Sequence, residues 1–231
     1  MAGKRTKTDI KYAIQLDEDQ KKVKADIYTN QIVIVTGRAG SGKSLVCANI
    51  AADLFFQKHD GISKIYVTRP IVETGRSLGY LPGTLDEKFN PYLEAFRENL
   101  YKCYADTTEK KEKLEKHFKD KDIDAMPIAF IRGKTIDDVL VVEETQNLTS
   151  HEVSAIVSRL GKTGKIIFNG DFDQCDLRPD VGQRLYTGLH YLNDMAKAIP
   201  EIKLHHLKNN HRSDLVGKIL DWEYARKKSN E

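Results

Sequence analysis

The stretch that most constrains the fold of this chain is residues 32–44, IVIVTGRAGSGKS. It begins with a run of β-branched apolar residues, which is typical of a buried strand, and continues into a glycine-rich turn and the apolar, helix-prone sequence LVCANIAADLFF. Residues 37–44 fit the pattern GxxxxGK[ST]. The pattern predicts a strand, a phosphate-binding loop (P-loop) and a helix N-terminus.

Each fixed position of this motif has a chemical role. Glycines let successive backbone N–H groups point at phosphate oxygens, and the helix dipole adds partial positive charge there. Lys43 can reach the β- and γ-phosphates, and the Ser44 hydroxyl can bind Mg²⁺. The expected phosphate-binding residues are Gly37, Arg38, Ala39, Gly40, Ser41, Gly42, Lys43 and Ser44.

Upstream of the motif, residues 17–25 are expected to form a polar helix that contains Gln20. A glutamine in this place can read an adenine edge through its amide, or it can simply lie on a surface.

Composition sets the broad class of the protein. With 231 residues, 40% of them apolar and 31% charged, the chain can bury a sizeable core, and we expect one domain over residues 12–226. A flexible basic segment over residues 1–11 and a basic tail over residues 227–231 flank it. The net charge of +3 permits a nucleic-acid partner without arguing for one. Three scattered cysteines and the lack of a long apolar run predict reduced thiols, no membrane span and a cytoplasmic location.

Apolar runs alternate with helix-prone segments along the chain. Strands are expected at residues 32–35, 64–68, 127–131, 139–142, 165–169 and 202–207, with helices between them. Residues 106–121 are predicted to form a charged, exposed helix, inserted in the domain and anchored only by Leu114 and Phe118. A last helix from Asp214 is expected to turn Leu215, Val216, Ile219 and Leu220 inward. The alternation predicts a three-layer α/β domain with a mostly parallel central sheet.

Polar side chains follow two of the expected strands and the segment after the last one. Glu143 and Glu144 end the run VLVV, where a P-loop NTPase needs one acid for the metal and another for the attacking water. We assign Glu143 to the metal, with Ser44, and Glu144 to the water as general base. The amide of Gln174, in the sequence GDFDQ, can contact the γ-phosphate. Arg212 is interpreted either as a source of transition-state charge or as a surface residue that caps a helix.

The order GxxxxGKS, strand-EE, strand-GDxxQ and then an arginine resembles the first motor domain of superfamily 1 helicases. A narrower resemblance, over roughly residues 12–226, is to the PhoH family of ATPases. It rests on RPIVETGRSLGYLPGTLDEKFNPYL from Arg69, IAFIRGKT from Ile128, VVEETQN from Val141 and GDFDQCDL from Gly170. The resemblance implies a single RecA-like core that binds and hydrolyses ATP with Mg²⁺. It also implies action on or with single-stranded nucleic acid, either RNA or DNA with RNA favoured, and a homo-oligomer such as a hexameric ring.

Two departures from the family pattern affect the expected site. The family usually has Asp-Glu where this chain has Glu143-Glu144, which changes the reach of the metal ligand. The family's C-terminal segment commonly reads like VRHPLV, whereas NHRSDLV around Arg212 is closer to the helicase form.

A helicase closes two lobes on ATP, and this chain has one. We therefore expect neighbouring subunits to complete the site. Nucleic acid is expected to contact Arg69, Arg132 and Lys134, each of which could instead be structural.

Two other functions remain open from the sequence. One is a P-loop kinase of a small molecule or nucleotide, although such kinases usually carry an arginine-rich lid and lack GDxxQ. The other is a nucleotide-sensing module that binds ATP with little turnover, which the glutamate at position 143 keeps open.

Overall fold

Six parallel strands form the central sheet, in the order β3-β2-β4-β5-β1-β6. The strands are β1 (Ile32–Gly37), β2 (Ile65–Thr68), β3 (Ile123–Ala125), β4 (Val139–Val142), β5 (Lys165–Gly170) and β6 (Ile202–Leu207). The computed structural model describes residues 14–70, 85–177 and 185–228. The N-terminal basic segment, the apolar loop over residues 74–83 and residues 229–231 lie outside that range. The predicted α/β fold with a mostly parallel sheet is confirmed.

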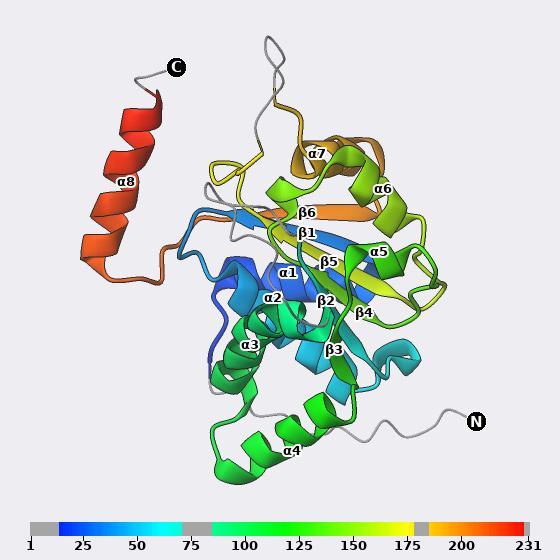
Figure 1. Cartoon of the computed structure of the whole chain (residues 1–231). Helices are drawn as coiled ribbons and strands as arrows, with labels where there is room; N and C mark the ends of the chain where they lie inside the picture. Colours follow the sequence, from blue (N-terminus) through cyan, green and yellow to red (C-terminus); the bar gives the residue numbers. More distant parts are fainter. Residues whose placement is uncertain (1–13, 71–84, 178–184, 229–231) are drawn as a thin grey trace.

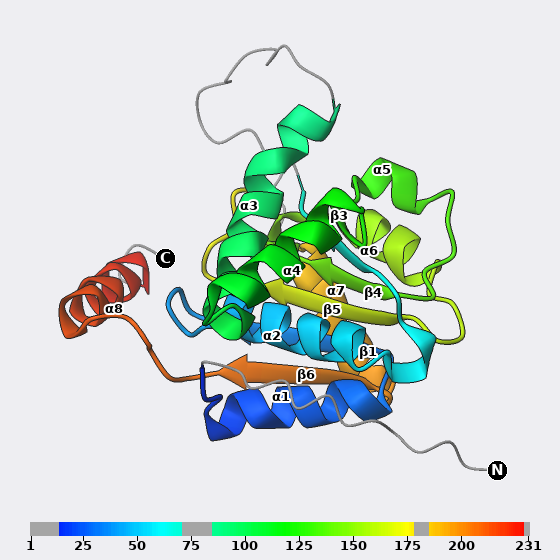
Figure 2. The same ribbon diagram turned by 90° about the horizontal axis from the view of Figure 1, so that it is seen from below.

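Helices cover both faces of the sheet (Figures 1 and 2). One face carries α1 (Glu18–Thr29), α2 (Lys43–Phe56), α3 (Leu85–Tyr104) and α4 (Thr108–Lys119). The other carries α5 (Ile128–Ile131), α6 (Ser150–Val157) and α7 (Gly188–Ala198). Two short 3₁₀ turns, η1 (His59–Gly61) and η2 (Thr145–Asn147), complete the connections. This is the three-layer arrangement that the sequence predicts.

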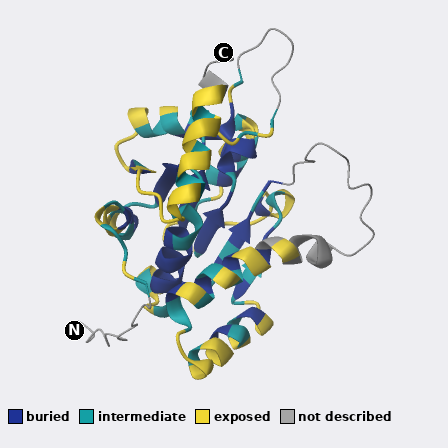
Figure 3. Ribbon diagram, turned by 90° about the vertical axis from the view of Figure 1, so that its left-hand side faces the viewer, coloured by how far each residue is buried: buried dark blue, intermediate teal, exposed yellow. Residues whose placement is uncertain are grey.

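The two cores follow from the alternation of side chains along the strands. Val33 and Val141 point into the core beneath α1, α2 and α3, whereas Ile34 and Leu140 point into the core beneath α6 and α7. Every residue of β1, β4 and β5 is buried, and the dark strands at the centre of Figure 3 show this layer. Central parallel strands are covered on both faces, which is why their sequences are apolar runs rather than alternating patterns.

The parallel register brings the polar residues of the motifs to one edge of the sheet. Thr36 pairs with Gly170, and Val142 pairs with both Phe168 and Thr68. The residues that directly follow β1, β4 and β5 therefore lie side by side, at the edge where open α/β sheets bind ligands.

The strand predicted at residues 127–131 is wrong. The structure has a short helix, α5, in its place, and the strand lies earlier, at Ile123–Ala125. Pro127 has no N–H to give to a strand ladder, and the Phe130 N–H donates to the Pro127 carbonyl in a turn (2.9 Å). The edge strand β3 pairs only with β2, so a three-residue segment suffices and gives little apolar signal.

The last helix, α8 (Asp214–Lys228), corrects a second prediction. It lies beside the domain rather than on the sheet (Figure 1), and Leu215 and Ile219 are 68% and 47% exposed. The helix turns its other face to the P-loop, where Arg38 Nη1 lies 2.9 Å from Asp221 Oδ1. Leu215 and Ile219 lie one turn apart and therefore share a helix face. Their exposure shows that this face is turned to solvent. The helix also includes Lys227 and Lys228 of the expected basic tail.

Three smaller expectations concern the charged helix, the cysteines and the membrane. In α4 the buried residues are Leu114 and Phe118, as predicted. All three cysteines lie in the described part of the chain and are free thiols there. Among the described helices, none combines the length and the apolar character that a bilayer crossing requires.

Candidate active site

The loop between β1 and α2 has the backbone conformation of a phosphate cradle. Gly40 and Gly42 have positive φ angles of 85° and 81°. A Cβ at Gly40 would lie 2.7 Å from Asn210 Oδ1, and one at Gly42 would lie 2.8 Å from Gln20 Nε2. Only glycine fits both positions without strain. Gly42 is also the N-cap of α2 and provides no side chain to cap it, so the first N–H groups of the helix face the loop.

Two side chains in the loop, Ser41 and Lys43, are placed where they could contact a bound anion. The Ser41 hydroxyl is buried and has no hydrogen-bond partner within the described residues. Lys43 Nζ donates to the carbonyls of Gly37 (2.6 Å) and Arg38 (3.1 Å) and lies 4.0 Å from Asp171 Oδ2. Burial lowers the pKa of Lys43, while the nearby carboxylates of Asp171 and Glu144 oppose this shift. A phosphate chain fits here because it would give the Ser41 hydroxyl a partner and the Lys43 ammonium a charged one in place of carbonyls.

Ser44 and Glu143, the two residues expected to bind the metal, lie close together in the structure. Asn169, the residue before the end of β5, joins them: its Nδ2 lies 3.4 Å from Glu143 Oε1 and 3.5 Å from Ser44 Oγ. Burial raises the pKa of Glu143, and a hydrogen bond with Ser44 opposes this rise. The hydroxyl and carboxylate oxygens suit Mg²⁺, which usually takes its remaining ligands from water and phosphate. The role of Asn169 was missed from the sequence, where it stands as one polar residue at the end of IIFN.

Glu144 lies at the rim of this site in a left-handed backbone conformation, with φ 52°. Its Oε2 accepts a hydrogen bond from Gln146 Nε2 (2.5 Å), and its Oε1 lies 4.0 Å from Arg69 Nη2. The carboxylate lies close enough to the P-loop to oppose the lowering of the Lys43 pKa.

Gln146 is the residue that the sequence reading missed most clearly. It is 1% exposed and makes contacts on both sides of the site. Besides Glu144, its Nε2 reaches the Gln174 carbonyl (3.0 Å), and its Oε1 accepts the Asp171 N–H (3.0 Å). Gln146 therefore holds the segment after β4 against the segment after β5. Its signal in the sequence is only a polar residue within the run EETQN.

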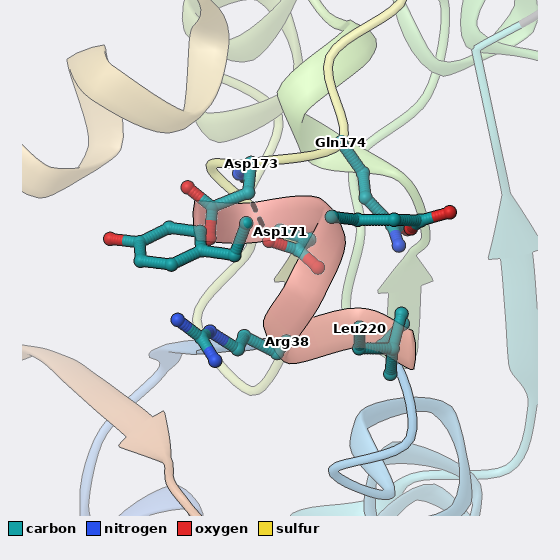
Figure 4. A pocket seen from close by; sticks show the side chains of 8 residues that line it. Arg38, Asp171, Asp173, Gln174 and Leu220 are labelled. Carbon is teal, nitrogen blue, oxygen red and sulfur yellow. Dashed lines mark hydrogen bonds between the residues drawn. The ribbon is translucent and has the colours of Figure 1, made fainter. Parts of the chain in front are cut away.

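The side chain of Gln174 is exposed and faces a pocket that Figure 4 shows from close by. The P-loop, the segment after β5 and α8 line the pocket. Arg38 points away from the phosphate cradle and toward α8, with its guanidinium 4.0 Å from the centre of the Tyr224 ring. The lining residues are Arg38, Ala39, Asp171, Asp173, Gln174, Leu220, Glu223 and Tyr224.

The segment after β6 lies against the tip of the P-loop. The His211 N–H donates to the Gly40 carbonyl (2.9 Å), and Arg212 packs its side chain beside Gly40. Gln20 is buried, and its Oε1 accepts the Asp17 N–H at the start of α1 (3.2 Å). Gln20 Nε2 lies 3.4 Å from His211 Nε2, so the structure brings Gln20, His211 and Arg212 to the same side of the loop. His211 was not singled out from the sequence.

The three basic residues expected to meet nucleic acid have different surroundings. Arg69 follows β2 and reaches Glu144, whereas Lys134 places its ammonium 5.5 Å from the centre of the Tyr66 ring. Arg132 and Lys134 are exposed on the turn after α5, next to Phe130, which is 55% exposed.

Comparisons with known proteins show the family of the chain. A family model described as "PhoH-like protein" matches residues 14–223. A PhoH-like protein of Bacillus subtilis is 36% identical over 206 residues, which is 87% of this chain and 61% of that protein. Protein PhoH of Escherichia coli is 32% identical over 167 residues, which is 71% of this chain and 45% of that protein. The chain thus spans about half the length of these relatives.

A solved structure supports the fold alone. The large terminase of a thermophilic bacteriophage aligns with a TM-score of 0.51 at 12% sequence identity, covering 89% of this chain and 49% of the terminase.

The contacts of Gln146 predict a stability effect. Replacing Gln146 by Leu leaves the Asp171 N–H and the Glu144 carboxylate without their buried partner, and we expect a loss of about 1–3 kcal/mol in the free energy of unfolding. Urea denaturation measures this change. The matched variant Gln57→Leu changes an exposed glutamine whose acceptor, Asp53, keeps its contacts with Lys24 and Tyr28, and it should cost less than Gln146→Leu. Equal stability of the two variants would contradict the role assigned to Gln146.

Proposed function

The chain belongs to the PhoH-like protein family, and from that premise we propose that it binds ATP with Mg²⁺ and hydrolyses it at the P-loop. One observation carries this proposal. The cradle, the Ser44–Glu143 pair and Glu144 meet at the carboxyl edge of β1, β4 and β5, linked through Asn169 and Gln146. Phosphate binding, metal binding and water activation thereby have separate residues within one site.

Binding would begin with a change of partner at Lys43. Its ammonium leaves the Gly37 and Arg38 carbonyls for the β- and γ-phosphates, while backbone N–H groups of the loop and of α2 surround the phosphate oxygens. Ser44 and Glu143 would hold Mg²⁺, which when bound neutralises charge on the phosphates. Asn169 keeps the two ligands facing each other.

Hydrolysis would depend on Glu144 and the two segments beside it. Glu144 orients the attacking water and accepts a proton from it. Gln146 holds the Oε2 atom of Glu144 in place. Gln174 lines the pocket beside Asp171 and can contact the γ-phosphate. Arg212, beside Gly40, can supply positive charge to the transition state from within the same chain.

Adenine recognition would involve Gln20 and His211. Both border the P-loop next to Gly42, and the His211 ring is partly exposed there. Gln20 would keep the hydrogen bond from the Asp17 N–H to its Oε1 and would donate from its Nε2 to the base.

The first test is phosphate release from ATP by the whole chain. We expect Glu144→Gln to lower kcat by at least about 100-fold, because a general base typically contributes 10²–10⁴. Lys43→Ala should abolish turnover and weaken binding of a fluorescent ATP analogue. Glu201→Gln, at an exposed carboxylate before β6, is the matched control and should keep the wild-type rate. Turnover that survives Glu144→Gln, or transfer of phosphate to a small acceptor, would contradict the proposal.

We propose further that the protein acts on or with single-stranded nucleic acid, RNA rather than DNA. The exposed cluster of Phe130, Arg132 and Lys134 supports this, because it combines an aromatic ring with two cations at one turn. Bases stack on aromatic rings, and cations follow the phosphate backbone.

Fluorescence anisotropy with labelled single strands separates these two contributions. Lys134→Ala and Arg132→Ala should each weaken binding and reduce the slope of log K against log salt by about 0.7, the value for one phosphate contact on a single strand. Phe130→Ala should weaken binding by about 1–3 kcal/mol without changing the slope. Lys162→Ala, on an exposed turn before β5, serves as the control. Identical affinities for all four variants would rule out this surface.

We also propose that copies of the chain assemble so that a neighbour closes the site, because the pocket at Gln174 is lined on one side by the P-loop and the segment after β5, and on the other by α8, whose side chains there are partly exposed. Light scattering after size exclusion, with and without a non-hydrolysable ATP analogue, should give a multiple of the chain mass that increases with the analogue. A monomer with full ATPase activity would exclude this arrangement.

A further inference from the structure

The carboxylate of Glu144 has two different sides. On the inner side, the almost wholly buried Gln146 donates from its Nε2 to Oε2 of Glu144 (2.5 Å). Arg69 faces Oε1 from the outer side, at 4.0 Å, and the two side chains of this pair are 36% and 37% exposed. One oxygen is therefore fixed, and the other has a partner that solvent can reach.

The sheet register explains why Arg69 reaches Glu144. Thr68 is the last residue of β2, and its carbonyl accepts the Glu143 N–H (2.9 Å), which extends the β2–β4 pairing to the strand ends. The register places Arg69 level with Glu143, and Glu144 is one residue further on, in a left-handed backbone conformation. The ends of the two strands therefore bring Arg69 and Glu144 within reach of each other.

The contact between Arg69 and Glu144 is weak enough to be exchanged. Half-exposed pairs at this distance gain little from their charge, because water and salt screen them. A phosphate group offers a guanidinium two parallel hydrogen bonds, which are stronger and geometrically better matched. A phosphate that arrives at this rim would take Arg69 from the carboxylate.

We propose that Arg69 couples the binding of a nucleic-acid strand to the action of Glu144. Without a strand, Arg69 restrains Oε1, the oxygen to which the attacking water would hydrogen-bond. When a backbone phosphate of the strand binds Arg69, Oε1 is released and the water takes its place, while Gln146 keeps the carboxylate in position. Arg69 is thus a positioning residue for hydrolysis, and the inference rests on the ATPase and strand-binding activities proposed above.

The test compares ATP turnover with and without saturating single-stranded RNA. Arg69→Gln should raise the strand-free kcat by up to about five-fold, which corresponds to about 1 kcal/mol, with the KM for ATP unchanged. Stimulation by RNA, measured as the ratio of the two rates, should fall close to one. Arg69→Lys keeps the charge and should restore the low strand-free rate.

Lys162→Gln is the matched control, since it removes an exposed cation that lies on the turn before β5 and outside the proposed sites. It should leave RNA binding, the strand-free kcat and the ratio at saturating RNA unchanged. A simple structural role for Arg69 would instead lower both rates equally.

Three outcomes would overturn the coupling role: an unchanged ratio in Arg69→Gln, an equal loss of both rates, or a raised strand-free rate in Arg69→Lys as well. Arg69→Ala gives a second reading if Arg69→Gln folds poorly, as judged by circular dichroism. Failure of the coupling is distinguishable from failure of the proposed function. If Glu144→Gln abolishes turnover and RNA stimulates the wild type, only the role of Arg69 is in question.

Discussion

The parallel register of β2, β4, β5 and β1 is the constraint on which the site depends. Residues far apart in the chain become neighbours only because four strands end at the same edge. The P-loop follows one strand, the two glutamates follow another, and Asp171 follows a third. A shift of one residue in any pairing would turn side chains to the opposite face and separate Ser44 from Glu143. The buried apolar strands thus fix the site geometry as well as the core.

The site contains ionisable side chains whose charged forms are disfavoured by burial. Burial raises the pKa values of Glu143 and Asp171 and lowers that of Lys43. These groups are destabilised relative to water, and the partners present only partly compensate. A phosphate chain with its metal would bring opposite charges to both kinds of group. These buried groups therefore lower the folding stability of the protein without ligand, and binding of the phosphate chain and its metal would restore it. Such a trade of stability for function is common in active sites.

Local sequence patterns were sufficient to predict most of the fold. The P-loop and the strands β1, β2, β4, β5 and β6 each depend on a few consecutive residues, and the structure has them where the sequence predicts. The features that the sequence did not predict depend on contacts with residues far away in the chain. Nothing local marks β3, a three-residue edge strand defined by its pairing with β2. The contacts of Asn169 with Ser44, and of Gln146 with Asp171, join residues 125 and 25 positions apart. An apolar stripe likewise shows that α8 is amphipathic without showing what it faces.

The position of α8 bears directly on how a nucleotide could enter. The helix reaches the P-loop through Arg38, by an ion pair with Asp221 whose side chains are 43% and 74% exposed and by the Tyr224 ring. An exposed ion pair contributes about 0–1 kcal/mol, and an exposed cation–π contact about 0.5–1 kcal/mol. A triphosphate that engages the P-loop backbone, Lys43 and a metal ion makes many charge-assisted hydrogen bonds, so this hold on α8 is too weak to exclude it. In the proposed ATP complex Arg38 would then turn from α8 to the phosphates, and α8 would keep Leu215, Ile219 and Trp222 exposed.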